Sequence, residues 1–238
     1  GFGGITDIKE GPDGLIYVVS IGYEKIYRII PSSQNTQLQI DCNDEISPGK
    51  NFSGCNLANL NLSNLDLSFV DLSYANLENT NLMGASLVNA TLVGSNLSNT
   101  KIINTDFSNA NLDSALMAEL TITDSKFMGA SLKSVDSEDS IFTDTDFSNA
   151  NLERAIFSGS DFSNTNLQNT YLVGADFSQT KMHLVNMEDS VLNYVNFKNA
   201  NLESSNLKNT IIYKADFHNA KLKNITMIGS DNYETNFH

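Results

Sequence analysis

Residues 71–97 read DLSYANLENTNLMGASLVNATLVGSNL, and the same five-residue pattern runs through most of the chain. Each repeat centres on a large apolar residue, such as Leu72 or Leu77. Two residues before it stands a small or β-branched residue, and the residue between them is mostly Asn or Asp. The pattern continues without a slip from Phe52 to Phe237, so a tandem repeat accounts for about four fifths of the sequence.

The spacing of the repeat excludes a helix and predicts short extended segments. In an extended chain, side chains two residues apart share one face. The small and the large residue therefore point inward, and the Asn or Asp between them points to solvent. A period of five does not keep an apolar stripe on one side of a helix. The remaining two residues, often Ser-Asn, Glu-Asn or Val-Gly, turn a corner, and regular corners wrap the chain into stacked coils.

Over residues 50–238 these repeats resemble those of the pentapeptide-repeat family, whose motif is A-[D/N]-L-x-x. The resemblance implies an all-β fold, a right-handed quadrilateral parallel β-helix with four repeats in each coil. Residues twenty apart support this geometry. One expected inner column consists of leucines: Leu72, Leu92, Leu112, Leu132, Leu152, Leu172 and Leu192. A second consists of phenylalanines: Phe157, Phe177, Phe197, Phe217 and Phe237. About nine coils, each rising about 4.8 Å, would give a rod about 45 Å long.

One central position, Ser137, interrupts an inner column between Met117 and Phe157. Its surroundings at residues 133–141, KSVDSEDSI, are the most acidic stretch of the array. We therefore expect a local irregularity of the coil over residues 133–141.

Residues 1–31 follow a different pattern. The segments ITDI at 5–8, LIYVVS at 15–20 and KIYRII at 25–30 predict two or three strands, separated by the turns GPDG and SIGYE. Because the sequence starts at Gly1 within such a pattern, we expect the native N-terminus to lie upstream.

This segment resembles the last blade of the β-propeller in pyrroloquinoline quinone (PQQ)-dependent glucose/sorbosone dehydrogenase-like proteins. There, a similar stretch with GPDG, followed by IYRI, closes the propeller. No catalytic His or Arg of that family is visible in residues 1–31, so no catalytic or cofactor role is transferred. One blade fragment cannot bury a core. The resemblance therefore implies a larger propeller upstream and an exported or cell-envelope location. Residues 32–49 are interpreted as the linker and the cap of the first coil.

The two cysteines, Cys42 and Cys55, flank the start of the array. A disulfide between them would tie the cap to the first coil and would suit an exported protein. Alternatively, Cys55 only fills a small inward position of the first repeat. The sequence leaves both interpretations open.

No sequence motif predicts catalysis, a cofactor or a metal. The patterns HExxH, CxxC, GxSxG and the P-loop are absent. His183, His218 and His238 each follow a central position by one residue and should face solvent. We therefore predict that this chain is not an enzyme and binds no cofactor. No apolar run reaches the roughly 18 residues that a membrane span needs.

The charge of the chain makes nucleic acid a poor partner, since 28 acidic side chains outnumber 14 basic ones. Residues 51–180 hold 15 acidic and four basic side chains, a net charge of −11, whereas residues 181–238 hold six of each. Some members of the pentapeptide-repeat family resemble DNA in shape and charge and bind topoisomerase. Here the acidic segment presents roughly 1.7 charges per coil, while DNA presents about 2.8 over the same rise.

The clearest surface anomaly lies in the C-terminal coils. Apolar residues spaced twenty apart form an outward column, at positions where other repeats mostly carry Asn, Asp, Ser or Thr. Further apolar residues lie beside this column. Contiguous apolar surface with tyrosines is typical of interfaces. The alternative is that Val and Ile are only tolerated at outward β positions. The predicted interaction wall consists of Tyr171, Val173, Val191, Tyr194, Ile211, Tyr213 and Tyr233.

Three functions follow from these observations. The leading one is a non-catalytic protein-interaction or scaffolding solenoid, a C-terminal appendage of a larger propeller protein. Its partner would be another protein or a second copy, bound through the C-terminal coils. The first alternative is the C-terminal part of a PQQ-dependent sugar dehydrogenase-like enzyme, in which this chain would be inert. The second is a DNA-mimicking, topoisomerase-binding protein.

Overall fold

The computed structural model describes residues 5–10, 16–20, 25–29, 42 and 45–238. The chain divides into two compact units, Gly1–Gln39 and Ile40–His238.

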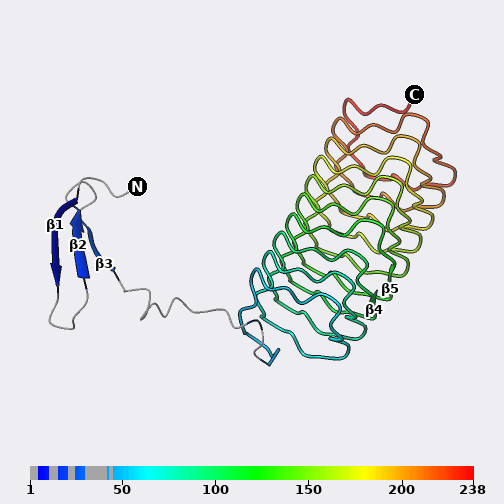
Figure 1. Cartoon of the computed structure of the whole chain (residues 1–238). Helices are drawn as coiled ribbons and strands as arrows, with labels where there is room; N and C mark the ends of the chain where they lie inside the picture. Colours follow the sequence, from blue (N-terminus) through cyan, green and yellow to red (C-terminus); the bar gives the residue numbers. More distant parts are fainter. Residues whose placement is uncertain (1–4, 11–15, 21–24, 30–41, 43–44) are drawn as a thin grey trace. The chain divides into compact units, whose positions relative to one another are not determined.

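The first unit contains an antiparallel sheet in the order β1-β2-β3 (Figure 1). Strand β1 spans Ile5–Glu10, β2 spans Ile16–Ser20 and β3 spans Lys25–Ile29. The three strands expected from the sequence are confirmed. The predicted turn GPDG and residues 32–41, 43 and 44 of the predicted linker lie outside the described residues.

The second unit is a right-handed quadrilateral parallel β-helix whose coils stack along one axis (Figure 1). Residues twenty apart form parallel bridges, such as Asn51 with Asp71. Strands β4 (Ile102–Ile103) and β5 (Ile122–Thr123) extend this bridging to two residues and lie side by side in adjacent coils. The predicted fold of the array is therefore confirmed.

Four sides run along the rod, and we name them by the inward residue that each has in the second coil. These residues are Leu72 on side A, Leu77 on side B, Leu82 on side C and Leu87 on side D.

Backbone hydrogen bonds join each coil to the next. The N–H of Phe107 donates to the carbonyl of Lys126 at 2.7 Å. Within a corner, the N–H of Ala110 donates to the carbonyl of Phe107 at 2.9 Å. Because neighbouring coils satisfy each other's donors and acceptors, the ladder depends little on which side chains the repeats carry.

The corners require an unusual backbone conformation. Every fifth residue from Gly54 to Glu234 has a positive φ, between 51° at Asn104 and 78° at Gly229. Asn, Asp and Gly adopt this left-handed conformation at the lowest cost. This preference explains why they occupy most corners.

The Asn or Asp before each inward residue also supports the corner. The Oδ1 atom of Asn51 accepts the backbone N–H of Ser53 at 2.8 Å, and the same contact recurs in later coils. These side chains also link coils, since Nδ2 of Asn76 donates to Oδ1 of Asn56 at 3.2 Å. They therefore satisfy polar groups of the chain in addition to facing water.

The predicted inner columns are confirmed. All seven leucines of the first column are buried. In the second column, successive rings from Phe157 to Phe237 lie with their centroids 4.8–5.7 Å apart. The hydrophobic core thus runs along the inside of the rod.

The irregularity expected over residues 133–141 is limited to one corner, where the Oγ atom of Ser160 bonds to the N–H of Ser140 and to the carbonyl of Ser137. The ladder itself is regular there. Asp136 bridges to Ile156, and the N–H of Ser137 donates to the carbonyl of Ile156 at 2.9 Å. The ladder continues because its bonds use backbone groups, which a change of inward side chain does not remove. Ser137 is buried, and its hydroxyl has no hydrogen-bond partner among the described residues.

The start of the array is tied to the first coil by a disulfide between Cys42 and Cys55, whose Cα atoms are 5.5 Å apart. Cys55 is buried at an inward position of the first coil, so it fills this position and forms the disulfide as well. Ile46 is partly buried against the core. The N–H of Gly49 donates to the carbonyl of Ser68 at 2.9 Å.

Candidate interaction surface

Six residues of the predicted interaction wall lie together on side A of the C-terminal coils, and the seventh, Tyr194, lies at the edge between sides A and B. Tyr171 bridges to Val191, Val191 to Ile211, and Ile211 to Asp231. The same column is polar in the coils before the wall, where it holds Ser131 and Asn151. The apolar column therefore begins at Tyr171 and ends before Asp231.

The wall is open to solvent. Tyr171 is 42% exposed, Ile211 46%, Tyr194 53% and Tyr233 65%. Val173, Val191 and Tyr213 are half-buried between them. When a partner covers side chains of this size and exposure, a large apolar area is removed from water.

Three tyrosines form a connected cluster at the C-terminal end of the wall. The rings of Tyr194 and Tyr213 meet edge to face with centroids 5.3 Å apart. Tyr213 and Tyr233 stack at 5.9 Å with an interplanar angle of 4°. These contacts hold the rings as a pre-arranged surface, which reduces the conformational entropy that binding would cost.

One basic residue borders this cluster. The Nζ atom of Lys214 lies 5.0 Å from the centroid of the Tyr213 ring and 3.2 Å from a carboxylate oxygen of Glu234. Tyr213, and then Glu234, raise the pKa of Lys214 above its usual value. Lys214 therefore keeps its positive charge at the edge of the wall.

The polar residue within the wall is Asn193. Its Oδ1 atom accepts the backbone N–H of Tyr213 at 3.0 Å. This acceptor is satisfied inside the chain, so covering the wall would not leave it without a partner.

The structure places the other chemically active residue types on the outside. His183, His218 and His238 are exposed, as expected. Among the described residues, no group of three or more His, Cys, Asp or Glu could hold a metal ion. The described part of the chain also contains no helix that is long and apolar enough to cross a bilayer.

The carboxylates take part in the repeat structure. At Asp66, hydrogen bonds from the hydroxyl and then the backbone N–H of Ser68 lower the pKa of the carboxyl group. A carboxylate held in this state stays ionised at neutral pH and is poorly suited to act as a general acid.

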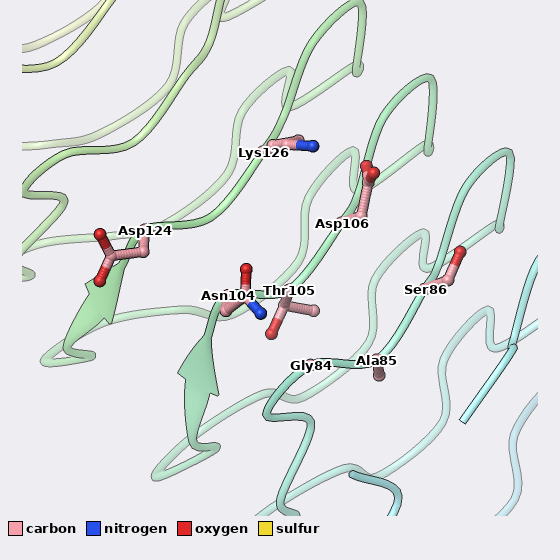
Figure 2. A pocket seen from close by; sticks show the side chains of 8 residues that line it. All are labelled: Gly84, Ala85, Ser86, Asn104, Thr105, Asp106, Asp124 and Lys126. Atoms are coloured by element: carbon pink, nitrogen blue, oxygen red, sulfur yellow. The ribbon is translucent and has the colours of Figure 1, made fainter. Parts of the chain in front are cut away.

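A polar cavity of about 210 Å³ lies on the edge between sides C and D. Figure 2 shows the residues from three successive coils that line it. Gly84 lines it in its first coil, and Asp106, Asp124 and Lys126 supply its charges. The buried hydroxyl of Thr105 already donates to the carbonyl of Leu82 at 2.9 Å. Thr105 therefore offers no unpartnered buried group to a ligand in this cavity.

Comparison with protein families decides what kind of repeat this is. The family model described as pentapeptide repeats matches in eight copies. The matched ranges include 51–88, 80–118, 122–159, 140–179, 160–193, 170–209 and 190–229. The chain belongs to the pentapeptide-repeat family. None of these ranges includes the first 50 residues, so the propeller resemblance of residues 1–31 stays a prediction.

Solved pentapeptide-repeat proteins are similar to this chain at low identity. HetL, involved in heterocyst differentiation regulation in the cyanobacterium Nostoc sp. strain PCC 7120, is 22% identical over 79% of this chain and 87% of its own, with a TM-score of 0.29. A protein of the Arabidopsis thaliana thylakoid lumen is 26% identical over 51% and 70%, with a TM-score of 0.29. QnrB1, a plasmid-mediated fluoroquinolone resistance protein, is 14% identical over 77% and 91%, with a TM-score of 0.32.

At TM-scores this low, the solved structures do not indicate what this pentapeptide-repeat chain binds. No curated protein matches the chain significantly. The surface of this pentapeptide-repeat rod is therefore what indicates its function.

Proposed function

We propose that this chain is a non-catalytic protein-binding solenoid, and that it binds its partner through the interaction wall. The observation that carries the proposal is the continuous apolar column of Tyr171, Val191 and Ile211 on side A. Outward positions of the repeat elsewhere are mostly polar, and their Asn or Asp side chains support the corners. An apolar residue at an outward position cannot make this hydrogen bond to the backbone of the corner.

The charge distribution agrees with a protein partner at this place. The coils before the wall carry the excess of acidic groups, whereas residues 181–238 have balanced charges. Apolar and charge-balanced surface is typical of the centre of protein interfaces, from which charged residues are depleted.

We further propose that the chain is the C-terminal appendage of a larger propeller protein and works in an oxidising compartment. The resemblance of residues 1–31 and their antiparallel strands β1–β3 support the first part. The disulfide between Cys42 and Cys55 supports the second, because such bonds persist in exported proteins. Reading the gene upstream of the Gly1 codon tests both parts: a propeller pattern and a signal peptide are expected.

Protein capture tests the interaction wall. The tagged chain and its Tyr171→Asp/Ile211→Asp variant are incubated with extracts of cells that express the protein, and the retained proteins are identified by mass spectrometry. The charged side chains should abolish retention, because a carboxylate buried at an interface loses its hydration.

A matched control is the Leu116→Asp/Ile156→Asp variant, which changes two outward apolar residues on side B that are 49% and 42% exposed. This control should retain the same proteins as the unchanged chain. Equal retention by all three chains would rule out the interaction wall as the binding surface.

A further inference from the structure

The charges around the interaction wall are complementary to those of a second copy that is turned end for end and packed against the wall. Along the edge between sides A and B, Arg154 lies one coil before the wall and Glu234 lies in its last coil. Tyr194 lies on the same edge, two coils from each. All three residues are exposed. Opposite charges thus stand at equal distances on either side of an aromatic centre.

A two-fold axis through the coil of Val191 uses this symmetry. If the axis lies in the contact plane and runs across the rods, two copies pack side A to side A with their rods antiparallel. The coil of Tyr171 then faces the coil of Ile211 in the other copy. Because the edges between sides A and B coincide, Arg154 of each copy faces Glu234 of the other. Every contact occurs twice, as in other isologous interfaces.

This antiparallel pair also sets the exposed Asp189, on the edge between sides D and A, opposite Asp189 of the other copy. Within its own chain, Asp189 accepts a hydrogen bond from Asn209. Other arrangements of two copies bring like charges together along the edge that carries Arg154 and Glu234. Moving the axis half a coil toward Tyr171 places Arg154 opposite Lys214. A parallel pair, with the axis along the rods, places Asp231 opposite Glu234. It also aligns the two segments 51–180, each with a net charge of −11. Such repulsion disfavours these alternatives, whereas the antiparallel pair directs the acidic segments away from each other.

The geometry points to a second copy of this chain as the partner of the interaction wall, packed face to face and antiparallel about the coil of Val191. This inference rests on the proposed protein-binding function and names the occupant of the same surface. The contact spans five coils of about 4.8 Å, or about 20 Å along the rod. Interfaces of this size are small, so we expect a weak dimer that forms at micromolar or higher concentrations.

Sedimentation equilibrium of the full chain, from micromolar to submillimolar concentrations at low salt, tests this inference. The unchanged chain should show a monomer–dimer equilibrium. Arg154→Glu and Glu234→Arg should each weaken the dimer about tenfold, because each places like charges opposite one another. The double variant Arg154→Glu/Glu234→Arg restores opposite charges and should return the dissociation constant to within about threefold of the original value.

The controls separate this pairing from general charge effects. Lys221→Glu changes the net charge by the same amount as Arg154→Glu, but Lys221 is exposed on side C, opposite the wall. It should leave the dimer unchanged. Because Glu234 also pairs with Lys214 in its own chain at 3.2 Å, the rescue by the double variant is the decisive measurement.

A chain that stays monomeric at all concentrations would overturn the inference. So would a dimer that the single charge reversals do not weaken, or a double variant that does not recover. If the chain is monomeric but the Tyr171→Asp/Ile211→Asp variant still loses a captured protein, the proposed function stands and only the self-association fails.

Discussion

The hydroxyl of Ser160 donates a hydrogen bond to the backbone carbonyl of Ser137, 23 residues earlier in the chain, at 2.8 Å. The same Oγ atom accepts the backbone N–H of Ser140 at 2.9 Å. In other corners, such as that of Phe107 and Ala110, the corresponding N–H and carbonyl bond to each other directly. An inward serine of one coil therefore closes the corner of the coil before it.

Removing this hydroxyl should destabilise the rod. In the Ser160→Ala variant, the N–H of Ser140 and the carbonyl of Ser137 lose their shared partner inside the core. We expect the free energy of unfolding to fall by about 1–2 kcal/mol, since buried polar groups without partners are costly. Urea unfolding followed by circular dichroism measures the change. An unchanged midpoint would mean that the two backbone groups bond directly once the hydroxyl is gone.

The same substitution one coil earlier should have the opposite effect. The hydroxyl of Ser137 is buried and has no hydrogen-bond partner among the described residues. Ser137→Ala removes this unpaired group and should raise the free energy of unfolding by about 1 kcal/mol. Ser95→Ala, which removes the other such hydroxyl, should act in the same direction. A loss of stability in Ser137→Ala would show that a buried water satisfies this hydroxyl in solution.

The sequence predicts the features that depend on the period of the repeat. The stacking of Phe197 on Phe217 follows from their spacing of twenty residues, and so does the outward column of Tyr171, Val191 and Ile211. The role of Ser160 could not be predicted, because it depends on the distance between a side chain and a corner in the neighbouring coil. The irregularity expected over residues 133–141 is limited to the corner of Ser137 and Ser140, because backbone groups build the ladder on either side of it.

Backbone conformation at the corners gives a third prediction. Leu184 turns a corner with φ of 58° and is 52% exposed, so it bears the cost of a left-handed conformation without filling the core. Leu184→Asn should stabilise the rod by about 1 kcal/mol, because Asn adopts this conformation more easily. Thermal unfolding measures the effect.

The matched reverse change is Asn164→Leu, at the same corner one coil earlier, where φ is 62°. This variant should lose a similar amount of stability. If both variants unfold at the original temperature, the corner residue does not limit the stability of the rod.

The disulfide at the start of the array gives the last prediction. Cys42 and Cys55 are 13 residues apart, and their bond restricts the unfolded chain. A loop of this length corresponds to about 3 kcal/mol of stabilisation. Reduction should therefore lower the unfolding temperature of the array, and the first coil should open before the rest, since each coil is held mainly by its neighbours.

Thermal unfolding with and without a reductant, together with hydrogen exchange of the first coil, measures this effect. The Cys42→Ser/Cys55→Ser variant should unfold at the temperature of the reduced chain and should not respond to the reductant. If the reductant lowers the unfolding temperature of this variant as well, the effect does not come from the disulfide. If reduction changes neither the unfolding temperature nor the exchange of residues 51–70, the contacts of Ile46 and Gly49 hold the first coil without the bond.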